Sequence, residues 1–100
     1  VDLIFAHSDL QLLYALEATE DAGLTDTLHF IGCGGQKEVI RLVMDGVVTA
    51  TAKRTNEFPQ ALDLALQILR GRSVEWETIL PWELVTEENA GSFYDPYSVF

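Results

Sequence analysis

The chain is poor in cysteine and in basic residues, and both shortages exclude classes of protein. Cys33 is the only cysteine among 100 residues, so neither an internal disulfide nor a cysteine-based metal site can form. Only six Lys and Arg oppose 16 Asp and Glu, which gives a net charge of -10. Such an acidic surface repels phosphate, and we therefore expect no nucleic acid to bind through this segment.

The few basic residues are confined to the middle of the chain. Residues 1–36 hold six acids and no Lys or Arg, residues 73–100 hold six more acids and no base, and every base lies between Lys37 and Arg72. Solubility is the simplest explanation of such an acidic surface.

Long hydrophobic runs are also missing. No run approaches the roughly 20 apolar residues that a membrane-spanning helix needs. The sequence opens on Val1-Asp2-Leu3, within a strand pattern and without an initiator Met or a signal segment, so we expect a fragment or a mature-chain piece. With 48% apolar residues, its composition fits one small domain.

What the sequence does contain is a regular alternation of strand and helix patterns. Short apolar runs predict strands at 1–6, 28–32, 47–52 and 79–85. Helices are predicted between them, beginning near Asp9, Gln36 and Glu57. The alternation predicts the α/β class, with a small, four-stranded, mostly parallel sheet flanked by helices.

Glycine and proline mark the ends of these elements. Each predicted helix is followed by a glycine that suits a left-handed C-terminal position, namely Gly23, Gly46 and Gly71. Pro59 is tolerated in the first turn of the third helix. Pro81 identifies the last strand as an edge or crossing strand rather than a central one.

Ligands of such sheets bind beyond the carboxyl ends of the strands. Three groups of residues follow the first three strands and are expected to face one crevice: His7, Ser8 and Asp9; Cys33, Gly34 and Gly35; Lys53, Arg54 and Thr55. Simpler roles remain open, because Ser8 and Asp9 suit a helix cap and His7 suits an ordinary loop. Arg54 either holds an anion or paired hydroxyls, or forms an ion pair with a neighbouring acid.

Patterns that would indicate catalysis are weak. The glycines around Cys33 lack the third glycine of a dinucleotide-binding fingerprint, and no acidic residue ends the next strand. Cys33 precedes a helix N-terminus, which favours a thiolate, but its histidine candidates are only His7 and His29, and His29 lies inside a strand. A flavodoxin-like enzyme or receiver would need a phosphate loop or clustered acids at strand ends. We therefore predict a protein that is not an enzyme and has no metal and no cofactor.

Four stretches, in their order and spacing, resemble the C-terminal part of type I periplasmic solute-binding proteins, the ribose and galactose kind, which are related to lac-repressor-type ligand cores. They are Phe5-Ala6-His7-Ser8-Asp9, Phe30-Ile31-Gly32-Cys33-Gly34-Gly35, Asp45-Gly46 with Ala50-Thr51-Ala52, and Leu84-Val85-Thr86-Glu87-Glu88-Asn89. The resemblance implies part of a two-lobed fold that closes around its ligand.

The resemblance also implies a binding site. The C-terminal lobe of that family usually contributes an Asn, an Asp and a Gln to sugar hydroxyls, and by position these become Ser8, Gly34 and Arg54, while Asp9 keeps the acid at the helix start. With His7, these residues form the expected ligand-binding set. The loss of an acid at Gly34 and the gain of a cation at Arg54 suggest an anionic ligand, or one bound mainly by the other lobe.

By the same resemblance, the chain divides into three parts. Residues 1–54 belong to the C-terminal lobe, residues 55–78 hold a helix expected to pack on the missing lobe, and residues 79–100 form a returning strand and tail. Without that lobe, the Leu and Ala stripe of the helix has to cover this chain's own sheet or a second copy, so we expect the isolated chain to self-associate.

The function implied is binding of a small polar solute, a sugar or sugar-like molecule, for uptake by an ABC-type transporter. The expected partners are the solute and a membrane permease or sensor protein, and the expected location is periplasmic or extracellular. Two alternatives share the fold: a ligand-sensing domain of a receptor or kinase, and the core of a lac-repressor-type regulator, which would be cytoplasmic.

Overall fold

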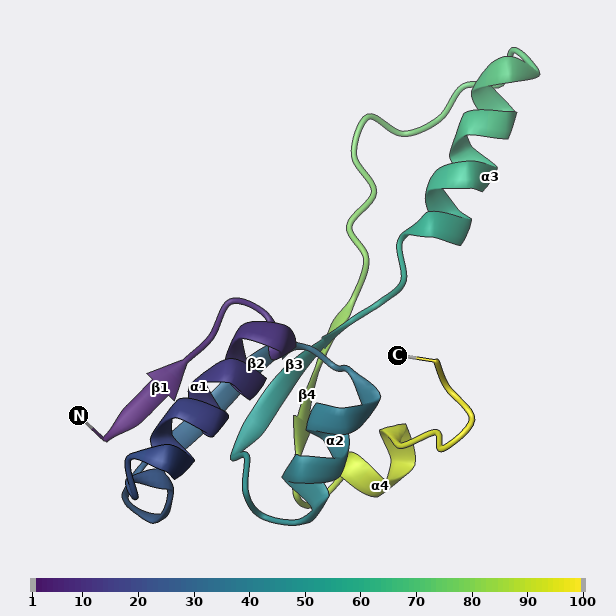
Figure 1. Ribbon diagram of the computed structural model, residues 1–100. Helices are drawn as coiled ribbons and strands as arrows, with labels where there is room; N and C mark the ends of the chain where they lie inside the picture. Colours follow the sequence, from purple (N-terminus) through teal and green to yellow (C-terminus); the bar gives the residue numbers. More distant parts are fainter. Residues whose placement is uncertain (1, 100) are drawn as a thin grey trace.

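The computed structural model describes residues 2–99 as a sheet covered by helices on one face, with a long arm projecting from it (Figure 1). The strands are β1 (Leu3–Phe5), β2 (His29–Gly34), β3 (Ala50–Arg54) and β4 (Trp82–Thr86). The helices are α1 (Asp9–Asp21), α2 (Lys37–Met44), α3 (Phe58–Leu69) and α4 (Ala90–Phe93), with a 3-10 turn, η1, at Thr25–Thr27.

The strands follow one another across the sheet in the order β1-β2-β3-β4. The first three are parallel, and β4 runs antiparallel to β3, with Ala50 opposite Thr86 and Arg54 opposite Trp82. The predicted mostly parallel α/β sheet is therefore confirmed. The last strand is the exception to parallel pairing. Because α3 does not cross back over the sheet, the chain returns along β3 in the opposite direction (Figure 1).

Two predicted strand boundaries are wrong by several residues. The third strand begins at Ala50 rather than at residue 47, because Val47 and Val48 donate their backbone N–H groups to Leu42 O in the turn after α2. The last strand begins at Trp82, just after Pro81, and lies at the edge of the described sheet. The short helix α4 has no counterpart in the prediction, since four residues carry no periodic pattern.

Helix ends agree with the sequence signals. The Ser8 hydroxyl caps α1 by accepting the N–H of Gln11 at 3.3 Å. Pro59 lies in the first turn of α3. The glycines after the three long helices have φ values of 69°, 74° and 72°, which are the predicted left-handed conformations of Gly23, Gly46 and Gly71.

The core fills the space between the sheet and the helices α1 and α2. It contains Leu12 and Leu16 of α1, Val39, Ile40 and Val43 of α2, and Phe30 and Val85 of the sheet, with Val48 and Ala90 beside them. Strand side chains on the opposite face of the sheet are exposed: Leu3, Phe5, Trp82 and Leu84 are 47%, 57%, 55% and 61% exposed. One face of the sheet is therefore covered and the other is not.

The arm consists of α3 and the two segments that carry it away from the sheet (Figure 1). No described residue of α3 is buried, and Leu62 and Leu66 are 50% and 41% exposed, so the apolar stripe of this helix does not cover the chain's own sheet. The arm explains a radius of gyration of 17.0 Å, against about 13 Å for a compact chain of this length. No helix within residues 2–99 is long and apolar enough to cross a bilayer.

A buried carboxylate joins the strand ends. Asp9 is 1% exposed, and its two oxygens accept the Gln36 backbone N–H at 2.7 Å and the Thr51 hydroxyl at 2.8 Å. Gly32 makes the room for it, because a Cβ atom there would collide with Asp9 Oδ1 and approach Leu12 Cδ2 to 2.9 Å. One side chain thus ties α1, the β2–α2 turn and β3 together.

Replacing Asp9 should destabilise the whole sheet edge. Asp9→Ala removes both hydrogen bonds and leaves their donors without a partner, so the free energy of unfolding should fall by roughly 2 to 4 kcal/mol. Urea unfolding followed by circular dichroism measures the change, with Asp2→Ala at an exposed acid as the control. A loss below about 1 kcal/mol would contradict a structural role for this carboxylate.

Gly32 should tolerate no side chain. Its backbone has no positive φ, so Gly32→Ala acts only through the collision with Asp9 and Leu12 and should cost roughly 1 to 3 kcal/mol. Gly91→Ala is the matched control, because nothing lies within 4 Å of a Cβ atom at that helical position. Thermal unfolding compares the two variants, and equal midpoints would show that the space at Gly32 is not limiting.

Candidate functional site

An open groove lies at the carboxyl ends of β2 and β3, where the arm leaves the sheet. Its volume is about 850 Å³, and it is lined by Gly34, Gly35, Gln36, Lys53, Arg54, Thr55, Asn56, Glu57, Phe58, Ala61 and Ser98. The groove occupies the place where ligands of parallel sheets bind. It is therefore the candidate binding site.

Two of the three predicted groups of residues meet in this groove. Gly34 ends β2 and Arg54 ends β3, and both line the groove. The third group, His7, Ser8 and Asp9, is not part of the lining. His7 is exposed and packs edge-on against Phe5, with ring centroids 5.5 Å apart, and Ser8 caps α1.

Asp9 supports a wall of the groove without lining the groove itself. Its Oδ2 atom accepts the N–H of Gln36 and lies 3.3 Å from the position that a Cβ atom of Gly34 would take. The carboxylate therefore supports the turn that forms one wall of the groove. Since both oxygens are engaged and the side chain is buried, Asp9 in this conformation is not available to a ligand.

Arg54 lines the groove and also forms the ion pair that its position suggested. Its Nη2 atom lies 3.6 Å from Oε1 of Glu57, three residues further along the chain. Both side chains are more than half exposed, and such surface pairs contribute little to stability. The guanidinium can therefore exchange Glu57 for an anionic or hydroxylated ligand at small cost.

Lys53 is a second cation of the groove, held in place on the other side of β3. Its Nζ atom lies 5.1 Å from the ring centroid of Phe93, over the ring, and its stem lies against Gly35. A Cβ atom at Gly35 would approach Lys53 Cγ to 2.6 Å, and Gly35 has a φ of 73°, so only glycine fits here.

The C-terminal tail completes the lining. Ser98 borders the groove, and its carbonyl oxygen accepts a hydrogen bond from Lys37 Nζ at 2.6 Å. Sequence reasoning did not identify Ser98, because a contact between residues 37 and 98 leaves no local pattern. Phe93 of α4, whose ring lies against Lys53 Nζ, was missed for the same reason.

The chemistry of the lining suits binding. It offers backbone N–H groups of a glycine turn, two cations, the amides of Gln36 and Asn56, and the apolar ring of Phe58. Within the described part of the chain, no group of three or more His, Cys, Asp and Glu side chains is placed to hold a metal ion. These groups can hold hydroxyls or an anion by hydrogen bonds and charge.

Comparison with known proteins gives matches in structure only. No protein-family model matches the sequence, and no curated protein matches it. The fructose-binding periplasmic domain of a hybrid two-component system superposes with a TM-score of 0.85 at 27% identity, covering 92% of this chain and 32% of its own.

Two transport proteins match equally well in shape. A solute-binding protein of an ABC transporter from Bacillus halodurans C-125, with bound myo-inositol, has a TM-score of 0.86 at 25% identity over 93% of this chain and 33% of its own. Another from Actinobacillus succinogenes 130z, with bound D-allose, has a TM-score of 0.85 at 22% identity, over 92% of this chain and 34% of its own.

The chain spans about a third of the length of these structures. The chain has the fold of part of a type I periplasmic solute-binding protein, as the sequence motifs indicated.

Proposed function

We propose that this chain forms one wall of a cleft that binds a small polar solute, a sugar or sugar-like molecule, for uptake by an ABC-type transporter. The observation that carries the proposal is the groove at the strand ends, which brings Gly34 and Arg54 together. Hydrogen bonds and a hinge suffice for this function, because the ligand only shifts an equilibrium between open and closed forms. No covalent chemistry is required.

The most similar structures support this ligand class. One of them is a fructose-binding domain and another holds myo-inositol, and both molecules carry several neighbouring hydroxyl groups. The first is a periplasmic domain of a hybrid two-component system, and the second is a solute-binding protein of an ABC transporter. For this chain we accordingly propose a periplasmic location and a permease as partner.

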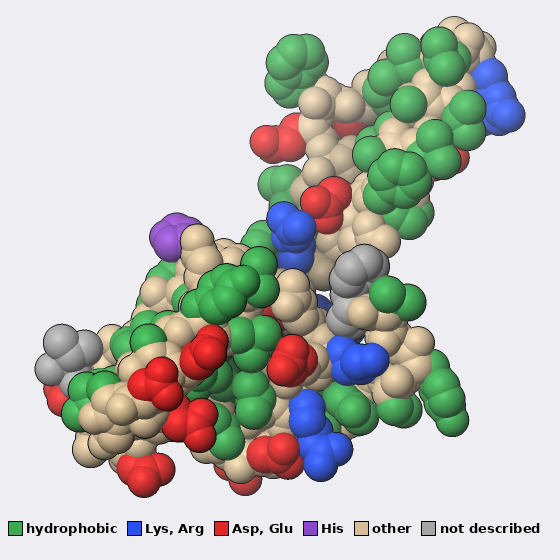
Figure 2. Space-filling model, in the orientation of Figure 1, with side chains coloured by type: hydrophobic (Ala, Val, Ile, Leu, Met, Phe, Trp, Pro, Cys, Tyr) green, Lys and Arg blue, Asp and Glu red, His purple; other side chains and the backbone are tan. Residues whose placement is uncertain are grey.

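The arm supports a two-lobed arrangement. We propose that residues 1–54 belong to one lobe, that the helix in residues 55–78 packs on a second lobe, and that residues 79–100 return to the first. The apolar surface of α3, seen as hydrophobic side chains along the arm in Figure 2, is what such packing requires. The cleft would then lie between the groove and the second lobe.

The charge of the groove favours the more polar or acidic members of this ligand class. Lys53 and Arg54 both line the groove, and Glu57 is the acid that pairs with Arg54. A ligand with a carboxylate or phosphate would displace Glu57 from the guanidinium and gain a charge-assisted hydrogen bond. We therefore propose an acidic sugar or a polyol that uses Arg54 as a hydrogen-bond donor.

Ligand sensing is the second candidate function. Its support is that one similar structure is the periplasmic domain of a hybrid two-component system rather than of a transporter. The same cleft would serve, and its closure would be passed to a kinase instead of a permease.

Arg54 provides the direct test of the site. In the two-lobed protein that carries this segment, Arg54→Ala should weaken binding by at least roughly 2 kcal/mol, because a charged contact of a desolvated ligand is lost. Arg54→Gln should keep affinity for neutral sugars and lose it for acidic ones. Titration calorimetry against a panel of neutral and acidic sugars measures both.

The control for this test is Arg70→Ala, which removes the same charge at the far end of α3. It should leave the affinity unchanged. If both Arg54 variants also bind normally, Arg54 does not belong to the site and only pairs with Glu57.

The arm predicts the behaviour of the isolated chain. We expect residues 1–100 alone to form dimers or larger species, because α3 exposes Phe58, Leu62, Leu66, Ile68 and Leu69. Leu62→Glu with Leu66→Glu should yield monomers in sedimentation velocity at the same concentration. Neither residue is buried, so the fold should survive.

A matched pair of changes on α1 tests whether the association depends on α3 or on exposed apolar side chains in general. Leu10→Glu with Tyr14→Glu adds the same charge at two exposed positions and should leave the association intact. A monomeric unmodified chain with well-protected amides in α3 would show instead that the helix folds back on the sheet.

A further inference from the structure

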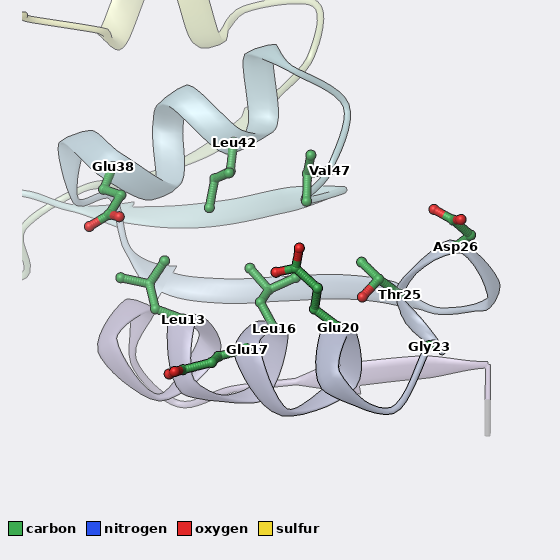
Figure 3. A pocket seen from close by; sticks show the side chains of 10 residues that line it. All are labelled: Leu13, Leu16, Glu17, Glu20, Gly23, Thr25, Asp26, Glu38, Leu42 and Val47. Carbon is green, nitrogen blue, oxygen red and sulfur yellow. The ribbon is translucent and has the colours of Figure 1, made fainter.

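A second groove lies between α1 and α2, on the covered side of the sheet (Figure 3). Its volume is about 720 Å³, and it is lined by Leu13, Leu16, Glu17, Glu20, Gly23, Thr25, Asp26, Glu38, Leu42 and Val47. It shares no lining residue with the groove at the strand ends. A molecule bound here would leave the proposed solute site free.

The groove has an apolar floor and an acidic rim. Leu13, Leu42 and Val47 point into the space between the two helices, while the carboxylates of four acids stand around it (Figure 3). The acids are Glu17, Glu20, Asp26 and Glu38, and the lining contains no Lys or Arg. Figure 2 shows acidic side chains gathered over this part of the body.

Two of these acids do not serve the stability of their own helix. Glu20 lies in the last turn of α1, where the helix dipole is negative and where no basic residue offsets it, and Glu17 lies just before that turn. They are three residues apart on one face, so they also repel each other. Acids that cost stability at these positions call for another explanation.

A hydroxyl group in the same groove lacks a partner. Thr25 Oγ1 is buried and makes no hydrogen bond within the described structure. An unpaired buried hydroxyl is unfavourable. Rotation of this short side chain would present the hydroxyl to a polar group of a molecule in the groove.

We propose that the groove between α1 and α2 binds a basic amphipathic helix of a partner protein. The apolar side of such a helix would cover Leu13, Leu42 and Val47, and its Lys and Arg residues would reach the four rim carboxylates. Charge complementarity selects this occupant. The same acids repel lipid and nucleic-acid phosphates, and a second copy of this chain carries a net charge of -10.

The test uses a synthetic amphipathic helix of about 15 residues, long enough to form helix when bound, with Leu on one face and Lys on both flanks. Its binding to the chain is followed by titration calorimetry and by amide chemical shifts. Shifts should concentrate in residues 13–26 and 38–47. A companion peptide with Glu in place of Lys should not bind.

Matched variants assign the binding to the rim. The triple change Glu17→Gln, Glu20→Gln and Glu38→Gln should weaken the Lys peptide at least about tenfold at low salt. Glu75→Gln, Glu77→Gln and Glu83→Gln removes the same charge outside the groove and should leave affinity within about twofold. Val47→Asn, at a position already 42% exposed, should weaken binding by removing part of the floor.

Protein stability supplies a readout that does not depend on the peptide. Glu38 lies in the first turn of α2, where the helix dipole favours an acid, so the stability test uses only the double change Glu17→Gln and Glu20→Gln. Because Glu20 opposes the dipole of α1 and repels Glu17, this double variant should melt at the same temperature as the unmodified chain or higher. A lower melting temperature would show that these acids are structural and would overturn the proposal.

Four other results would overturn it as well. Equal loss of affinity in both triple variants, or shifts spread over the whole acidic surface, would mean that the peptide is attracted only by net charge. No binding of the Lys peptide would exclude a basic helix. A rim variant that changes the self-association of the chain without affecting the peptide would identify a second copy as the occupant.

Discussion

The Asp9 carboxylate is the interaction on which the rest of the structure depends. It lies where three parts of the chain meet, and its two oxygens accept hydrogen bonds from the β2–α2 turn and from β3. Gly32 has no side chain because the carboxylate occupies that space. The glycine turn that forms one wall of the proposed solute site therefore has its position set by a buried charge, and a buried charge is tolerable only when its hydrogen bonds are made.

The uneven covering of the chain is the second constraint, and it connects the fold to the proposed function. The helices α1 and α2 bury one face of the sheet, whereas Phe5 and Leu84 on the other face and Leu66 on the arm remain exposed. The chain spans a third of the similar structures. In the proposed two-lobed arrangement, a second lobe facing the strand-end groove would cover the apolar surface of the arm and close the proposed solute site at once.

Charge divides the surface into two kinds of site. The bases of the strand-end groove, Lys53 and Arg54, belong to the segment 37–72, which holds all the Lys and Arg of the chain. The groove between α1 and α2 takes its acids mainly from residues 1–36, which contain no base. The uneven charge thus gives the two grooves opposite character, which is the basis for proposing an anionic or hydroxylated solute at one and a cationic partner at the other.

The sequence by itself determined the features that depend on neighbouring residues. Ser8 as a helix cap, Gly23, Gly46 and Gly71 as helix ends, and the alternation of strands with helices follow from local hydrogen bonding and backbone freedom, and the family motifs identified the correct fold. For the site, Gly34 and Arg54 were placed in the groove by the rule that ligands bind at the carboxyl ends of parallel strands.

Only the tertiary structure decided the rest. Asp9 is buried by partners 27 and 42 residues away, and Ser98 reaches the groove through Lys37, which is 61 residues away. The antiparallel return of β4 and the exposure of α3 depend on where the chain leads the helix, which no periodicity records. Contacts of this range arise when elements pack, because the energy that selects them comes from surfaces brought together by folding rather than from adjacent residues.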